Sequence, residues 1–107
     1  MDSNGRSFDE LFQLVWEWFE ERNLQDPVMQ LVKVNEEIGD ICHEVSRGKF
    51  DSVNLIDALG DSFVTLIGMC HHLGIDPKAT LNAAYDEIKD RKGKVVNGSF
   101  VKDGDDR

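Results

Sequence analysis

The sequence has few of the features that mark several large classes of protein. Its two cysteines, Cys42 and Cys70, are isolated and form no CxxC pair, which favours reduced thiols over a disulfide framework. Uninterrupted apolar runs are only a few residues long, so no segment is expected to span a bilayer, and the polar start lacks the apolar stretch of a signal peptide. These absences favour a soluble, cytoplasmic protein.

Basic residues are scarce beside acidic ones. The chain has 12 Lys and Arg against 21 Asp and Glu, a formal charge of −9. This balance argues against nucleic acid as a partner, because duplex binding depends on Lys and Arg displacing counterions. Four of the basic residues nevertheless fall within Lys89–Lys94, a local patch that suits a phosphate-bearing small molecule.

Proline occurs only twice, and Pro27 and Pro77 both suit the first turn of a helix. The 107 residues, 40% of them hydrophobic, fit a single domain with one core. Apolar residues recur at helical spacing in four segments, with Ser7 and Asp51 as the expected N-caps of the first and third. Helices are therefore expected at about 7–22, 27–46, 51–72 and 77–91.

The C-terminal segment follows a different pattern. Asn97-Gly98 lies between two short β-prone runs, which predicts a hairpin at about 95–101. Residues 103–107 are charged and lack apolar anchors, so disorder is expected there. Together these patterns predict an all-α, four-helix bundle-like fold with a short C-terminal β-hairpin.

Two acidic clusters, Glu36–Asp40 and Asp57–Asp61, lie within the second and third predicted helices. Residues three or four apart share a face of a helix, so each cluster belongs to a polar stripe. If the helices are antiparallel neighbours, as the short connection near Gly48 implies, the stripes face each other, and a hard divalent cation is the natural partner of the gathered carboxylates. The stripes consist of Gln30, Lys33, Glu37 and Asp40 on one helix and of Asn54, Asp57 and Asp61 on the next.

The simpler alternative is that both clusters are solvated helix surfaces, as most charged residues on helices are. Gly39 and Gly60 weigh against it, since each precedes an acid and each costs a helix about 1 kcal/mol relative to alanine. Such glycines indicate close helix approach or room for a ligand. A non-catalytic helical module that binds a partner stays open as an alternative function.

The clusters resemble the MazG-like branch of the all-α nucleoside triphosphate pyrophosphohydrolases over about residues 27–91. That family carries Glu-Glu-x-x-Glu on one helix and Glu-x-x-Asp on the next. Here Glu36-Glu37-Ile38-Gly39-Asp40 matches the first motif with Asp in place of the last Glu, and Leu59-Gly60-Asp61 matches the end of the second. Ala58 stands where the second motif has its Glu, and Asp57 is the nearest acid.

The resemblance implies a house-cleaning enzyme that depends on Mg²⁺, with Mn²⁺ as a substitute, and hydrolyses a nucleoside triphosphate to the monophosphate and pyrophosphate. Glu36 is the first candidate to orient or deprotonate the attacking water, with Glu37 and Asp57 open as alternatives. Asp86 could supply the ligand missing at Ala58 or contact the nucleotide. The expected metal ligands are Glu37, Asp40, Asp61 and, directly or through water, Asp57.

Substrate contacts are expected outside the two motifs. Basic side chains suit the phosphates, and a flat apolar ring with a nearby amide suits the base, although a place in the core or a subunit interface is the favoured interpretation of the tryptophan. Related proteins form dimers or dimers of dimers, which implies a homodimer or homotetramer. Phosphoribosyl-ATP pyrophosphohydrolase and a phosphohydrolase that releases orthophosphate are the enzymatic alternatives. The substrate-binding candidates are Lys33, Lys89, Arg91, Gln30, Asp86 and Trp16.

Overall fold

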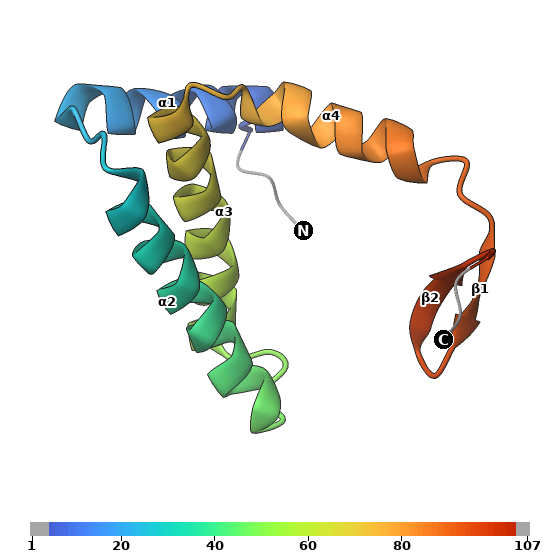
Figure 1. Cartoon of the computed structure of the whole chain (residues 1–107). Coiled ribbons are helices and arrows are strands. Elements are labelled where there is room, and N and C mark those ends of the chain that lie inside the picture. Colours follow the sequence, from blue (N-terminus) through green and yellow to red (C-terminus); the bar gives the residue numbers. More distant parts are fainter. Residues whose placement is uncertain (1–4, 105–107) are drawn as a thin grey trace. The chain divides into compact units, whose positions relative to one another are not determined.

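The computed structural model describes residues 5–104 (Figure 1). The chain divides into two compact units, 1–77 and 78–107. The first contains α1 (Phe8–Arg22), α2 (Pro27–Ser46) and α3 (Val53–Leu73); α4 (Pro77–Ile88), β1 (Gly93–Val96) and β2 (Ser99–Lys102) follow. The predicted class, four helices and a C-terminal hairpin, is confirmed. That the chain behaves as a single domain stays a prediction.

Several predicted helix ends are confirmed because their capping groups form the expected bonds. Ser7 accepts the N–H of Glu10 at 3.1 Å, and the Glu10 carboxylate accepts the N–H of Ser7, which completes the capping box. Pro27 occupies the first turn of α2. Gly74 ends α3 in the left-handed conformation, with φ of 68°.

Other boundaries differ from the prediction. Ser52, and not Asp51, is the N-cap of α3, because the Ser52 hydroxyl accepts the N–H of Leu55 at 3.1 Å. The fourth helix ends at Ile88 instead of Arg91, where a tighter turn joins the Arg91 N–H to the Ile88 carbonyl at 3.0 Å. Both corrections concern positions at which local hydrogen bonds, and not apolar spacing, decide the end of the helix.

The hairpin is confirmed and is slightly longer than predicted. β1 and β2 are antiparallel, with Val96 opposite Ser99, and both Asn97 and Gly98 have positive φ, as a tight hairpin turn requires. Asp103 donates its N–H to the Lys92 carbonyl at 2.9 Å, one residue past the strands, and disorder of the tail from residue 103 stays a prediction. The part of that prediction that concerns residues 105–107 lies outside the described residues.

In the first unit, α2 lies along α3, and α1 packs against α3. The closest approach of the three helices is at Gly68, where an added Cβ would lie 2.6 Å from Phe19 Cε1 and 2.7 Å from Gln30 Nε2. Both neighbours are buried, and the Gln30 amide donates to the Thr65 carbonyl at 2.9 Å. Glycine is therefore needed at position 68 for the helices to approach.

The two glycines of the acidic clusters do not serve this purpose. An added Cβ at Gly39 or Gly60 would meet no atom within 4 Å. The expectation that they mark close helix approach is wrong, and the space beside each of them is open.

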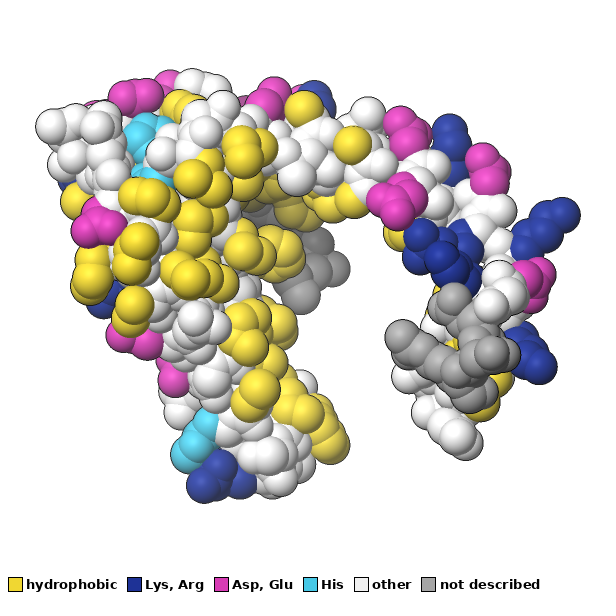
Figure 2. All heavy atoms as spheres, in the orientation of Figure 1, with side chains coloured by type: hydrophobic (Ala, Val, Ile, Leu, Met, Phe, Trp, Pro, Cys, Tyr) yellow, Lys and Arg dark blue, Asp and Glu magenta, His cyan; other side chains and the backbone are white. Residues whose placement is uncertain are grey.

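An apolar face remains exposed on the α2–α3 pair, and Figure 2 shows apolar side chains gathered over these helices. We define the face by residues that recur three, four or seven positions apart and so share one side of each helix. Phe63, at its centre on α3, is 64% exposed. The members are Leu31, Ile38 and Val45 on α2 and Leu59, Phe63 and Leu66 on α3.

The helix α3 is also long and apolar enough to cross a membrane, by length and composition only. A helix can reach a high average hydropathy with polar residues interspersed, so this finding does not decide whether the segment spans a bilayer, and the expectation that no segment does so stays a prediction. The core helix of a soluble protein passes the same test. The cytoplasmic location stays a prediction.

The substitution Gly68→Ala should destabilise the fold by about 1–3 kcal/mol, because the new methyl group must displace the buried Phe19 ring or the Gln30 amide. Denaturant unfolding measures the effect. Gly60→Ala on the same helix is the matched control and should stabilise by up to about 1 kcal/mol, since it meets open space and gains helix propensity. Equal effects of the two substitutions would contradict the packing described here.

Candidate functional site

The acidic stripes of α2 and α3 line one cleft of about 400 Å³ in the first unit. The helix pair places them there because α2 and α3 run antiparallel, as the Gln30–Thr65 bond near one end and a Glu44–Ser52 bond near the other show. The lining residues are Glu37, Asp40, His43, Glu44, Lys49, Asn54, Asp57, Ala58 and Asp61.

All four predicted metal ligands, namely Glu37, Asp40, Asp57 and Asp61, are among these lining residues. Glu36, the first candidate to activate water, is not. Its carboxylate is exposed and lies 3.7 Å from the Lys33 ammonium, one turn earlier on α2. Lys33 is therefore beside the cleft, paired with Glu36.

Carboxylates on the two helices influence each other across the cleft. Partial removal from water raises the pKa of Glu37, and the negative charges of Asp61, Asp40 and Glu36 raise it further, while Lys33 opposes them. The region thus carries a surplus of negative charge that one lysine does not neutralise. No three His, Cys, Asp or Glu side chains in residues 5–104 are yet close enough to hold an ion, so the predicted convergence is partial.

The floor of the cleft consists of its two buried lining residues, Glu44 and Ala58. The Ser52 hydroxyl donates a hydrogen bond to Glu44 Oε1 at 2.8 Å. Sequence reasoning missed Glu44, although it follows Glu37 and Asp40 at helical spacings of seven and four.

Lys49 and His43 also line the cleft and were not predicted. Lys49 lies in the connection between α2 and α3, where helical periodicity gives no signal. Its ammonium group adds a positive charge to a site otherwise rich in carboxylates. That combination suits a ligand with anionic groups bound together with a cation.

Two predicted substrate-binding residues lie elsewhere in the first unit. Gln30 is buried beside Gly68, with its amide bonded to the Thr65 carbonyl. The Trp16 ring packs edge-on against His71, with ring centroids 4.8 Å apart. Neither side chain lines the cleft.

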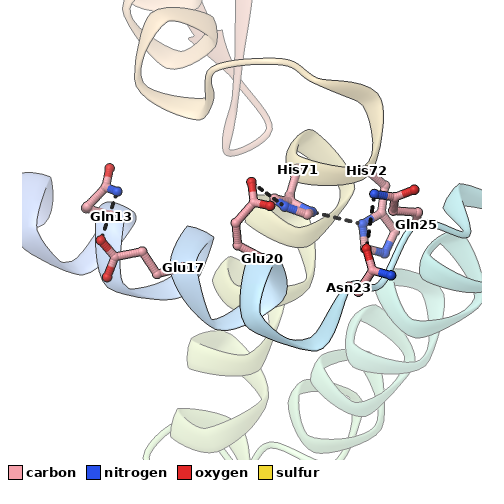
Figure 3. Close-up of polar contacts among 7 residues, drawn as sticks. All are labelled: Gln13, Glu17, Glu20, Asn23, Gln25, His71 and His72. Atoms are coloured by element: carbon pink, nitrogen blue, oxygen red, sulfur yellow. Dashed lines mark hydrogen bonds and ion pairs between the residues drawn. The ribbon is translucent and has the colours of Figure 1, made fainter.

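A histidine pair joins α3 to α1 at the opposite end of the helix (Figure 3). His71, whose side chain is 6% exposed, lies with Nε2 3.4 Å from Glu20 Oε1 on α1 and with Nδ1 3.4 Å from His72 Nδ1. Desolvation lowers the pKa of His72, the neighbouring His71 lowers it further, and Asp26 opposes both. The pair is a junction between helices and is separate from the cleft.

The remaining candidates, Asp86, Lys89 and Arg91, belong to the second unit. The Lys89 ammonium lies 3.3 Å from the Asp86 carboxylate, and Arg91 lies 3.5 Å from Glu87. These are pairs between neighbouring turns at a surface. Their contact with a substrate stays a prediction.

Comparisons with known proteins give little further information. No family model and no solved structure matches the chain. An uncharacterized 18.2 kDa protein in the rep-hol intergenic region of Haemophilus phage HP1 is 33% identical over 70 residues, which cover 63% of this chain and 42% of that protein. The chain thus spans less than half the length of this relative, whose name states no activity.

The substitution Glu37→Gln should raise the Tm by roughly 1–3 °C at pH 7 in EDTA, because it removes one member of a set of repelling carboxylates. The raised pKa means that the folded state holds the Glu37 proton more tightly, so desolvation and repulsion of the charged carboxylate cost stability as pH rises above 4.5, the value for the free side chain. The gain should therefore vanish near pH 4.

Glu21→Gln makes the same change at an exposed position on α1 and is the matched control. It should leave the Tm almost unchanged at both pH values. A lower Tm for Glu37→Gln at pH 7 would show that the carboxylates of the cleft do not repel one another.

Proposed function

We propose that the cleft binds Mg²⁺ together with the phosphates of a nucleoside triphosphate and that the protein hydrolyses this substrate to the monophosphate and pyrophosphate. One observation carries the proposal: carboxylates from two facing helices line a single cleft. The order of the two acidic motifs, which resembles the MazG-like pyrophosphohydrolases, supports it. The cellular role would be house-cleaning of the nucleotide pool.

The donor set fits a hard divalent cation. The charged side chains that the two stripes contribute to the cleft are all carboxylates, and Mg²⁺ and Mn²⁺ prefer carboxylate oxygens as ligands. Glu37, Asp40, Asp57 and Asp61 would hold the ion, and the three that are exposed have the rotational freedom to close around it. When bound, such an ion neutralises phosphate charge and activates water for attack at phosphorus.

The remaining steps fall to groups of the chain itself. Glu37 lines the cleft whereas Glu36 does not, so Glu37 is the better placed of the two to orient or deprotonate the attacking water. Lys49 is placed to bind a phosphate oxygen at the edge of the cleft. Lys33, already paired with Glu36, would assist from one side.

The test of the proposal is pyrophosphate release by the purified protein with Mg²⁺ and a panel of canonical and modified nucleoside triphosphates. Asp61→Asn should lower turnover on the order of 100-fold or more, because it removes a charged ligand. Asp51→Asn, outside the cleft, should have no effect. No pyrophosphate with any substrate would favour the non-catalytic helical module, and orthophosphate would indicate the other phosphohydrolase class.

Asp57→Asn distinguishes two roles in the same assay. Complete loss of turnover would place Asp57 among the direct ligands, as a replacement for the Glu that the family motif has at Ala58. A modest loss would place it behind a water molecule.

We also infer that a second copy of the chain covers the apolar face. That face repeats at the seven-residue spacing of Leu31, Ile38 and Val45, which is typical of helices that pack against helices. A homodimer or homotetramer would bury it.

Sedimentation equilibrium of the parent protein should therefore give a dimer or tetramer, and Phe63→Glu at the centre of the face should give a monomer. Val95→Glu, at an equally exposed position of the hairpin, is the matched control and should keep the parent assembly. A monomeric parent protein, or one that binds detergent micelles through this face, would contradict self-association.

A further inference from the structure

Glu44 is a carboxylate of the cleft that the proposed function has not yet used. It is 4% exposed, whereas Asp40, Asp57 and Asp61 are exposed. It is one of the two buried residues that line the cleft, and Ala58 is the other. A carboxylate withdrawn from water is unfavourable unless other groups compensate its charge.

The compensation within the chain is small. Glu44 Oε1 accepts a hydrogen bond from the Ser52 hydroxyl at 2.8 Å, and that hydroxyl in turn accepts the Leu55 N–H at 3.1 Å. The hydroxyl proton is thereby directed at Glu44, as suits a carboxylate acceptor. None of the ion pairs within residues 5–104 involves Glu44, so one neutral hydroxyl and the N-terminal end of α3 are its partners.

The second oxygen of Glu44, Oε2, is not fully buried. Oε2 accepts no hydrogen bond from the described residues. Among the described residues, every fully buried side-chain oxygen or nitrogen has a hydrogen-bond partner. Since Oε2 has none, it is not fully buried and keeps contact with solvent. Because Glu44 lines the cleft, the cleft supplies this opening. A charged acceptor is thus available at the floor.

The other buried lining residue, Ala58 on α3, offers no such group. Ala58 is 3% exposed and presents only a methyl group between the turns that carry Asp57 and Asp61. We propose that Glu44 is itself a ligand of the divalent cation and supplies, from α2, the carboxylate oxygen that Ala58 cannot supply from α3. The inference rests on the proposed function for the presence of a cation site in this cleft.

Isothermal titration of the whole chain with Mn²⁺, without nucleotide, tests the proposal. Glu44→Gln should weaken Mn²⁺ binding on the order of tenfold or more, since it removes a charged ligand. The amide oxygen still accepts the Ser52 hydrogen bond, so the Tm in EDTA should be unchanged or higher. Unchanged Mn²⁺ affinity in a folded Glu44→Gln protein would overturn the proposal.

A purely structural role for Glu44 predicts a different pattern. If the only role of Glu44 is to hold α2 against α3 through its hydrogen bond with Ser52, then Ser52→Ala should weaken Mn²⁺ binding as much as Glu44→Gln does. Ser52→Ala removes that hydrogen bond and keeps the carboxylate. If Glu44 is a ligand, Ser52→Ala should keep most of the affinity. Glu44→Asp, which keeps the charge but shortens its reach, should fall between the parent protein and Glu44→Gln.

The outcomes also separate this inference from the proposed function. A parent protein that binds no Mn²⁺ overturns both. A parent protein that binds Mn²⁺ but releases no pyrophosphate removes the proposed function, while the affinities of the variants still decide the role of Glu44. Pyrophosphate release together with unchanged Mn²⁺ binding by Glu44→Gln removes only the role of Glu44.

Discussion

The antiparallel contact between α2 and α3 is the constraint on which the first unit depends. Two polar bonds fix its register: the Gln30 amide with the Thr65 carbonyl, and the Glu44 carboxylate with the Ser52 hydroxyl. Between these bonds lie Glu37 and Asp40 on α2 and Asp57 and Asp61 on α3, which line the same cleft. A slip of one residue would rotate the acids out of the cleft, because neighbouring positions on a helix point about 100° apart.

This register brings like charges together, and the chain has little buried surface to offset the cost. The buried apolar residues of the first unit are Phe19, Leu55, Ala58 and Ile67. A unit of this size depends strongly on each buried group, since small domains bury a low fraction of their surface. A bound cation would remove the repulsion, and a second copy would bury the apolar face. Under the proposed function, both would stabilise the same helix pair from different sides.

The helices could be predicted because their apolar residues repeat, but their ends depend on which polar side chain forms the cap. Asp51 and Ser52 are both residues that cap helices well, and the sequence does not show that Ser52 also donates to Glu44. Gln30 shared a helix face with the acids and was predicted to bind substrate because its amide suits a base. Its side chain is long enough for the amide to donate to the Thr65 carbonyl instead. This hydrogen bond satisfies the amide and so allows a polar residue to be buried.

The site was predictable where it follows helical spacing and unpredictable where it does not. Glu37, Asp40, Asp57 and Asp61 line one cleft because spacings of three and four keep them on facing sides of α2 and α3. Lys49 joins them from a connection without periodicity. The residues of the second unit raise a different difficulty, since neighbouring charges such as Asp86 and Lys89 satisfy each other within one helix whether or not a substrate is present.

The alanine at position 58 has a physical reason if Glu44 is a ligand. Both residues are buried and line the same cleft, Glu44 from α2 and Ala58 from α3. An acidic side chain at position 58 would add another negative charge to a cleft that already holds several carboxylates. Under the proposal, a buried carboxylate from either helix would complete the cation site, and a second one would mainly add repulsion. A small residue at position 58 is then consistent with a buried glutamate at position 44.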